Sequence, residues 1–141
     1  MSAVRSSSRP TSKRSRRPRP SPFDELVHRV LAFRDARDWR QFHSPKELAI
    51  AISLEAAELL ERFQWKSPGE VAALVADPEG HRQVSWEMAD ILILLISLAD
   101  VVGTDLVEAA RDKLQKNEEK YPVERARGTA RKYSDLGVDD R

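Results

Sequence analysis

The chain has 141 residues and no cysteine, and its formal net charge at pH 7 is +1. This length suits a single domain, and the lack of cysteine excludes disulfides and thiolate metal sites. The three histidines lack metal-ligand spacing, so we expect any metal to be held by oxygen, which favours Mg²⁺ or Mn²⁺. No apolar run is longer than the six residues of Ile91–Ile96, which is too short to span a membrane, and a cytoplasmic protein is expected.

Charge is distributed unevenly between the N-terminus and the rest of the chain. Residues 1–22 contain seven basic side chains and no acid, and they are otherwise mostly serine and proline. Such a segment is predicted to be a disordered tail, and without an apolar run it is not a secretory signal. Because the tail contributes +7 to a total of +1, residues 23–141 carry −6. Nucleic-acid binding is therefore not expected of this folded domain, although the tail itself remains a candidate for contact with nucleic acid or an anionic surface.

Capping signals and apolar periodicity predict an all-α fold. Serine followed by proline marks helix starts at Ser21, Ser44 and Ser67, and Ser44–Glu47 has the form of a capping box. Residues 38–43 are interpreted as a loop, residues 77–80 as a break, and Gly103 as a helix end. The predicted helices span about residues 22–37, 45–63, 68–75, 81–102 and 104 or 105 to 121. Residues 123–141 are expected to form an ordered arm followed by a frayed end.

The helix predicted over residues 81–102 has an unusual pattern. Ile91–Ile96 is apolar all the way round, which predicts burial on every side. A domain this small can hardly surround one helix, so we expect a four- or five-helix bundle that forms a homo-oligomer through this helix. A strand is the competing interpretation, and the flanking segment Trp86–Asp90 argues against it. Trp86 itself is assigned to the core.

A nine-residue segment is repeated within the chain. Ile52–Leu60 aligns with Val84–Leu92 at an offset of 32 residues, with identical Ser, Glu, Ala and Leu at four positions and three near matches. This offset fits one helical hairpin repeated within a pseudo-symmetric bundle. The repeat predicts that equivalent residues of the two copies occupy equivalent places in the fold.

Each copy of the repeat carries two acids three residues apart. This spacing places Glu55 beside Glu58, and Glu87 beside Asp90, each pair on one helix face at the edge of an apolar stripe. Four converging carboxylates would repel one another and resist ionisation. A divalent cation removes that penalty, so the four acids are predicted to bind Mg²⁺, with Mn²⁺ as the alternative. Solvated acids on exposed helices are the competing interpretation.

The acid motif resembles the metal-binding signature of the MazG-like all-α nucleoside triphosphate pyrophosphohydrolases. Further segments resemble the dCTP pyrophosphatase branch, so that the resemblance covers about residues 23–137. These segments are Arg37–His43, Leu60–Lys66, Lys120–Val123 and Lys132–Leu136. The resemblance implies an all-α dimer or tetramer that cleaves a (deoxy)nucleoside triphosphate to the monophosphate and pyrophosphate. It also implies that Glu55, Glu58, Glu87 and Asp90 hold magnesium.

The resemblance further implies a nucleotide pocket built from aromatic and polar residues. The residues concerned are Trp39, Arg40, Gln41, Phe42, His43 and Trp65. Trp39 and Trp65 offer flat faces on which a base can stack. The chain departs from the branch pattern at Val30 and Leu94, where histidine and tyrosine are expected, and both departures concern the base and sugar pocket.

The chemistry of a triphosphate adds two further expectations. Magnesium would neutralise the phosphates and lower the pKa of a bound water, and a carboxylate would accept the proton of that water, with Glu58 as the candidate. Lys113, Asn117 and Lys120 share one face of the predicted fifth helix and are candidates for phosphate binding. Glu61 also lies three residues beyond Glu58, but the neighbouring Arg62 indicates a polar side, and Glu61 is not assigned to the metal site.

The expected function is removal of dCTP or a modified pyrimidine triphosphate from the nucleotide pool, with dUTP and oxidised purine triphosphates as alternatives. A different class is a non-catalytic helical protein that docks a partner through its basic tail. A third is a nucleic-acid adaptor driven by that tail, for which deletion of residues 1–22 would abolish function. The presence of both acid pairs favours the enzyme.

Overall fold

The computed structural model describes residues 19–136, which form six α-helices and two short 3-10 helices with no strand. The all-α prediction is therefore confirmed. The predicted tail lies largely outside the described residues, as do residues 137–141, and α1 already begins at Pro22. The elements are α1 (Pro22–Asp35), η1 (Trp39–Phe42), α2 (Pro45–Phe63), α3 (Pro68–Ala76), α4 (Pro78–Val102), α5 (Leu106–Lys120), α6 (Val123–Ala126) and η2 (Tyr133–Leu136).

Side-chain caps fix the starts of the helices. Ser21 and Asp24 form a reciprocal capping box at α1, where the Asp24 N–H donates to Ser21 Oγ at 3.2 Å and the Ser21 N–H donates to Asp24 Oδ2 at 2.9 Å. Ser67 caps α3 with the same kind of box. Ser44 accepts the hydrogen bond of the Glu47 N–H at 3.2 Å, which is the forward half of the predicted box. Each cap satisfies backbone N–H groups that have no partner within the helix.

Two boundaries differ from the sequence prediction. Asp77-Pro78-Glu79-Gly80 is not a break but the start of α4, because Asp77 Oδ2 accepts the Gly80 N–H at 2.8 Å and Pro78 occupies the first turn. Within the predicted loop, residues 39–42 form the single 3-10 turn η1. The end of α4 at Gly103 is confirmed, since this glycine adopts a left-handed φ of 70°.

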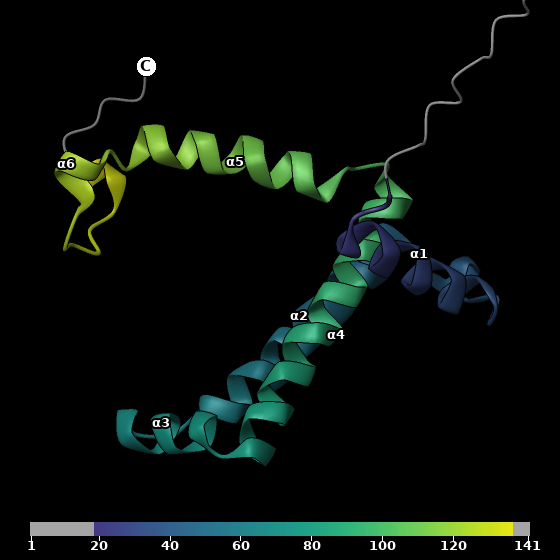
Figure 1. Ribbon diagram of the computed structural model, residues 1–141, viewed down its shortest axis with the longest axis horizontal. Helices are drawn as coiled ribbons and strands as arrows, with labels where there is room; N and C mark the ends of the chain where they lie inside the picture. The colour runs from purple at the N-terminus through teal and green to yellow at the C-terminus, as the bar shows by residue number, and fades with distance from the viewer. Residues whose placement is uncertain (1–18, 137–141) are drawn as a thin grey trace, which may run out of the picture.

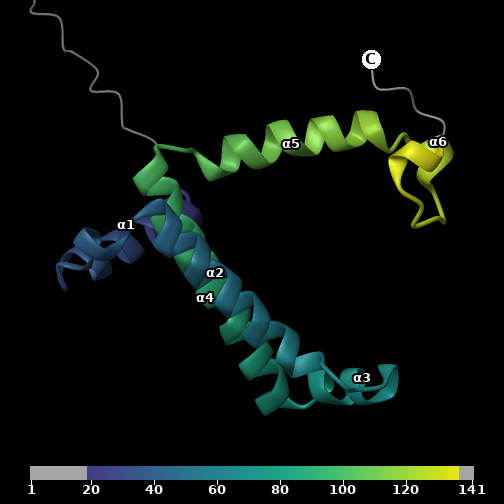
Figure 2. The ribbon, with the colours of Figure 1, turned by 180° about the vertical axis from the view of Figure 1, so that it is seen from behind.

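Helices α2 and α4 pack along each other and form the centre of the molecule, with α1 and α3 against α4 (Figure 1). The buried apolar residues are Val30, Leu48, Ile96 and Ala99. Helix α5 leaves the end of α4 as an arm that carries α6, and the view from behind shows the same separation (Figure 2). The acid motifs therefore lie on the two central helices.

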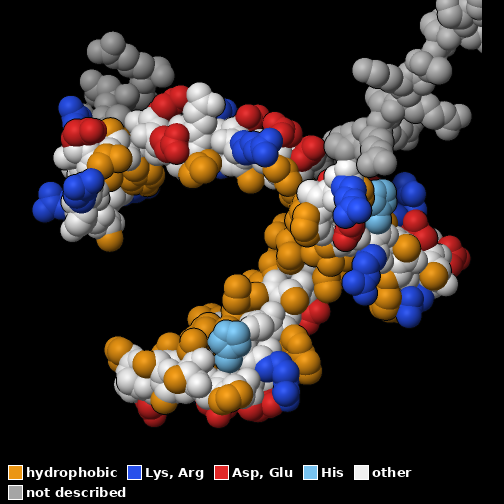
Figure 3. Space-filling model, in the orientation of Figure 1, with side chains coloured by type: hydrophobic (Ala, Val, Ile, Leu, Met, Phe, Trp, Pro, Cys, Tyr) orange, Lys and Arg blue, Asp and Glu red, His pale blue; other side chains and the backbone are white. Residues whose placement is uncertain are grey.

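A hollow lined by hydrophobic side chains opens between the α5 arm, the α2–α4 pair and α3 (Figure 3). Helix α4 is not buried on every side within one chain, because Leu92 is 37% exposed and Ile93 is 38% exposed. The assignment of Trp86 to the core is wrong for the single chain: this side chain is 61% exposed, and the Arg82 guanidinium lies 5.3 Å from its ring centroid. Within residues 19–136, no helix is long and apolar enough to cross a membrane.

Candidate metal centre

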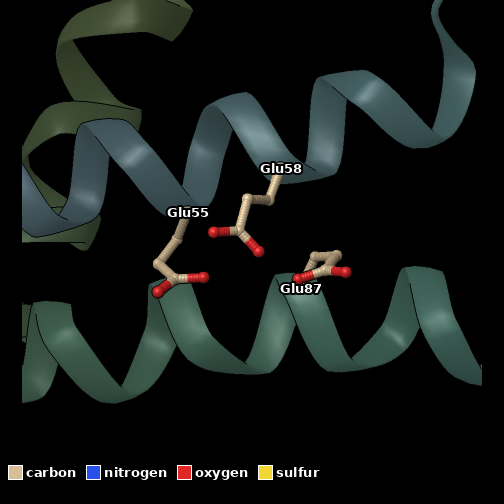
Figure 4. Close-up of side chains that lie close together, drawn as sticks. All are labelled: Glu55, Glu58 and Glu87. Atoms are coloured by element: carbon tan, nitrogen blue, oxygen red, sulfur yellow. The ribbon is translucent and has the colours of Figure 1, made fainter.

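Three of the predicted metal ligands meet between α2 and α4. Glu55 and Glu58 extend from α2 toward Glu87 on α4 (Figure 4), and one carboxylate oxygen from each lies within 4.8 Å of the others. These three residues form the acid cluster. The i,i+3 spacing on α2 brings the first two side chains to one face, and the antiparallel packing of α4 along α2 brings the third (Figure 1).

The three side chains of the acid cluster differ in solvent exposure. Glu87 is buried with 6% of its surface exposed, Glu55 is half-buried, and Glu58 is exposed. Burial raises the pKa of Glu55, and the nearby charges of Glu58, Asp90 and Glu87 raise it further. Both effects disfavour the ionised carboxylate, which is the penalty that the sequence predicted.

Asp90 lies one turn beyond Glu87 on α4 and is exposed. It is outside the group of three whose oxygens converge, although its charge contributes to the raised pKa of Glu55. The structure thus brings Asp90 near the acid cluster without placing it among the converging ligands.

Arg62 contacts the acid cluster and was not assigned a role from the sequence. Its Nε donates to Glu87 Oε1 at 2.9 Å, a terminal nitrogen forms an ion pair with the same oxygen, and the other donates to Gln83 Oε1 at 3.2 Å. The position of Arg62 on α2, four residues after Glu58, was the available signal. Its partner on α4 could not be read from local spacing.

The donor set fits a hard divalent cation. Carboxylate oxygens are the ligands that Mg²⁺ and Mn²⁺ prefer, and the acid cluster supplies one from each of three residues within 4.8 Å. Clusters of exposed acids often hold no ion, but here Glu87 is buried and the pKa of Glu55 is raised. The side chains therefore have the composition and the electrostatic strain that a bound cation would relieve.

The predicted base-pocket residues lie at opposite ends of α2. Trp39, Arg40, Gln41, Phe42 and His43 precede this helix, and Trp65 follows it. Nineteen helical residues separate the two groups, a length of about 28 Å at 1.5 Å per residue. One chain therefore does not bring Trp39 and Trp65 onto a single base.

The aromatic residues also differ in how they are engaged. Trp65 has a left-handed φ of 63° and is 93% exposed, so its indole has little contact within the chain. Trp39 is 44% exposed and packs edge-to-face on Phe33, with ring centroids 5.7 Å apart. Phe42 is 65% exposed. The two tryptophans thus remain accessible surfaces for a ligand or another chain.

The polar residues of the same segment have varied surroundings. Gln41 Nε2 donates to Asp38 Oδ2 at 2.8 Å, and Arg40 is exposed. His43 is half-buried, and among residues 19–136 its Nδ1 is the buried side-chain atom without a hydrogen-bond partner. Burial lowers the pKa of His43, and the Arg34 charge lowers it further, so both effects favour the neutral imidazole.

The predicted phosphate-binding residues Lys113, Asn117 and Lys120 lie on the α5 arm. Lys113 is exposed, and Lys120 Nζ lies 4.4 Å from the ring centroid of Tyr133. Figure 1 shows α5 directed away from the α2–α4 pair that carries the acid cluster. The structure does not bring these residues to the acid cluster of the same chain.

The fold and the acid cluster define an all-α protein with a candidate centre for a divalent cation. The model of the MazG-like family matches residues 50–136, and the chain belongs to this family. The resemblance inferred from its acid motifs is confirmed.

Curated relatives and a solved structure support this membership. The chain is 41% identical over 118 residues to dCTP pyrophosphatase 1 of Rattus norvegicus, which covers 83% of this chain and 69% of that protein. It is 39% identical over 118 residues to dCTP pyrophosphatase 1 of Homo sapiens, with the same coverage. A crystal structure of a pyrophosphatase from Archaeoglobus fulgidus has a TM-score of 0.69 and 41% identity, covering 77% of this chain and 99% of that chain.

Proposed function

We propose that the protein hydrolyses a deoxynucleoside triphosphate, with dCTP or a modified pyrimidine as the preferred base, to the monophosphate and pyrophosphate in a Mg²⁺-dependent reaction. Its membership in the MazG-like family and its identity to dCTP pyrophosphatases make it a nucleoside triphosphate pyrophosphohydrolase. The convergence of Glu55, Glu58 and Glu87 is the observation that carries the metal dependence. A role in the nucleotide pool agrees with the predicted cytoplasmic location.

The acid cluster supports a division of roles among its carboxylates. Glu55, Glu58 and Glu87, with Asp90 one turn beyond, would hold Mg²⁺, which supplies charge neutralisation at the phosphates and a lower pKa for a bound water. Within residues 19–136, no hydrogen bond or ion pair engages the exposed Glu58 carboxylate, whereas Glu87 is paired with Arg62. Glu58 therefore remains the candidate general base, since it is the exposed carboxylate of the acid cluster and its oxygens can accept a proton from water.

Preference for one nucleotide base depends on pocket residues that a single chain does not bring together. Trp39–His43 and Trp65 are the proposed base pocket, and Lys113, Asn117 and Lys120 the proposed phosphate contacts. Val30, at one of the two departures from the branch pattern, is buried on α1 with 7% exposure and offers no hydrogen bond to a base. Discrimination among pyrimidines would then rely on stacking and on polar groups elsewhere in this pocket.

The same residues support a homo-oligomeric enzyme. The acid cluster, the two tryptophan segments and α5 lie on separate parts of one chain, while a hydrophobic hollow is left open between α3 and α5 (Figure 3). Exposed apolar patches of this kind mark protein interfaces. A second copy packed against α4 would cover exposed apolar side chains such as Leu92 and Ile93 and would bring its own α5 or tryptophan toward the acid cluster.

A panel of nucleoside triphosphates with Mg²⁺ tests the proposed reaction by its release of pyrophosphate. Glu58→Gln should reduce the rate by at least about a hundredfold, since it removes the base and a metal ligand. Glu61→Gln is the matched control, an exposed acid one turn further along α2, and it should keep nearly full activity. Full activity in Glu58→Gln would contradict the assignment of the metal centre.

Light scattering after size-exclusion chromatography tests the oligomer. We expect the native chain to elute as a dimer or tetramer, and Ile93→Glu to shift it toward the monomer because a charge would enter the apolar interface. A native chain that is monomeric at micromolar concentration would contradict the oligomeric arrangement.

A further inference from the structure

A positively charged side chain of the protein, Arg62, already contacts the acid cluster. The Arg62 guanidinium binds Glu87 Oε1 through Nε and a terminal nitrogen, while its other terminal nitrogen is held by Gln83 Oε1. Gln83 and Glu87 are one turn apart on α4, so the guanidinium is fixed between two side chains of the opposite helix. This contact joins α2 to α4 at the candidate metal centre.

Burial makes the contact with Glu87 electrostatically important. The Glu87 side chain is 8% exposed and Arg62 is 38% exposed. A carboxylate this buried needs a countercharge, because its desolvation is costly. Without a metal ion, Arg62 supplies that charge, while Glu55 and Glu58 have no basic partner among the described residues.

A divalent cation and a guanidinium would therefore draw on the same carboxylate. Figure 4 shows the Glu87 carboxylate between the two helices, close to Glu58, and Arg62 holds one of its two oxygens. The positive charge of Arg62 withdraws negative potential from the acid cluster and repels a second cation. A hydrogen bond from Arg62 to Glu87 can also orient this carboxylate as a metal ligand and so strengthen metal binding. This effect would oppose the weakening caused by the positive charge.

We propose that Arg62 is a resident counter-ion of the acid cluster: it neutralises Glu87 in the metal-free protein and competes with the divalent cation for this carboxylate. The proposal rests on the proposed metal centre and adds a positioning residue that sets its affinity. It accounts for a buried acid on α4 that is stable before metal binds. It also means that the affinity for metal is lower than the acid cluster alone would give.

Direct binding of Mn²⁺, measured by electron paramagnetic resonance of the free ion without nucleotide, tests this competition. We expect Arg62→Gln to bind Mn²⁺ about tenfold more tightly than the native protein, because one nearby positive charge is removed. Arg62→Lys, which keeps the charge but not the paired contact, should bind with near-native affinity. Arg111→Gln is the control: its partner Glu108 is exposed on α5, away from the acid cluster.

Thermal unfolding separates the counter-ion from a merely structural role. Arg62→Gln should melt below the native protein without metal, because Glu87 loses its countercharge, and the melting temperature should rise more on addition of Mn²⁺. If Arg62 had only a structural role, Arg62→Gln would lower the melting temperature without metal but would not raise the affinity for Mn²⁺. In the native protein, nitrogen-labelled NMR should show the Arg62 Nε–H resonance moving on addition of Mg²⁺, a readout that is independent of any variant's folding.

If folded Arg62→Gln bound Mn²⁺ no more tightly than the native protein, the proposed competition would be wrong. It would also be wrong if the Arg62 Nε–H resonance did not move on addition of Mg²⁺. If Mn²⁺ binds neither the native protein nor the variant, the proposed metal centre itself fails and the counter-ion fails with it. Native binding with an unchanged variant contradicts only the role of Arg62 and leaves the proposed function standing.

Discussion

The junction between α3 and α4 depends on a glycine at position 80, and replacing it with alanine tests the packing directly. Gly80 is buried in the first turn of α4, where an added Cβ would lie 2.3 Å from the carbonyl oxygen of Leu74 and 2.7 Å from its Cδ1. The backbone oxygen cannot rotate away, so either the helices separate or α3 shifts. Overpacking of this kind costs about 1–3 kcal/mol, and Gly80→Ala should destabilise the protein by about 2 kcal/mol.

Gly69→Ala is the matched control for this substitution. Gly69 lies in the first turn of α3, and an added Cβ meets nothing within 4 Å. Alanine there should be neutral or stabilising by up to about 0.5 kcal/mol, because it restricts the unfolded chain. Urea unfolding followed by circular dichroism, at one protein concentration, measures both variants. Gly80→Ala with native stability would refute the close packing of α3 on α4.

Three further predictions concern charge. Arg34→Met should lower the free energy of unfolding by about 2 kcal/mol, since Arg34 is 2% exposed and pairs with Asp100 at 2.6 Å. Arg82→Met, which breaks the exposed pair with Glu79, should lower it by less than about 0.5 kcal/mol. Equal losses for the two variants in urea unfolding would contradict this prediction. The pKa of His43 is lowered in the folded protein, so the unfolded chain takes up a proton first and the folded state loses stability as pH falls below the ordinary value of 6.5. His43→Gln should therefore flatten the pH dependence of unfolding below 6.5, and an unchanged profile would contradict it. A chelator should abolish pyrophosphate release, and Mg²⁺ or Mn²⁺ should restore it; activity that survives chelation would exclude a metal role.

The helices were predictable because their signals are local. Serine caps followed by proline at Ser21, Ser44 and Ser67 mark three starts that the structure confirms. The start of α4 was missed because Asp77-Pro78-Glu79-Gly80 has the composition of a turn. The glycine favoured a break, whereas its actual role is the close approach to Leu74, and this contact depends on tertiary packing.

The acid cluster was predictable in part for the same reason. Spacing along each helix placed Glu55 beside Glu58, and the repeated segment indicated that Glu87 occupies an equivalent place on the facing helix. The contact of Arg62 with Glu87 joins residues 25 apart in sequence, and no local pattern predicts it. The surroundings of Trp86 were misjudged because periodicity identifies an apolar face but not whether one chain covers it.

The proposed pyrophosphohydrolase reaction is tested most directly by identifying the products that the full chain forms from dCTP with Mg²⁺, using phosphorus NMR. We predict dCMP and pyrophosphate, with the reaction lost in Glu58→Gln and retained in Glu61→Gln. Formation of dCDP and phosphate, or no reaction with dCTP or any other triphosphate of the panel, would contradict it.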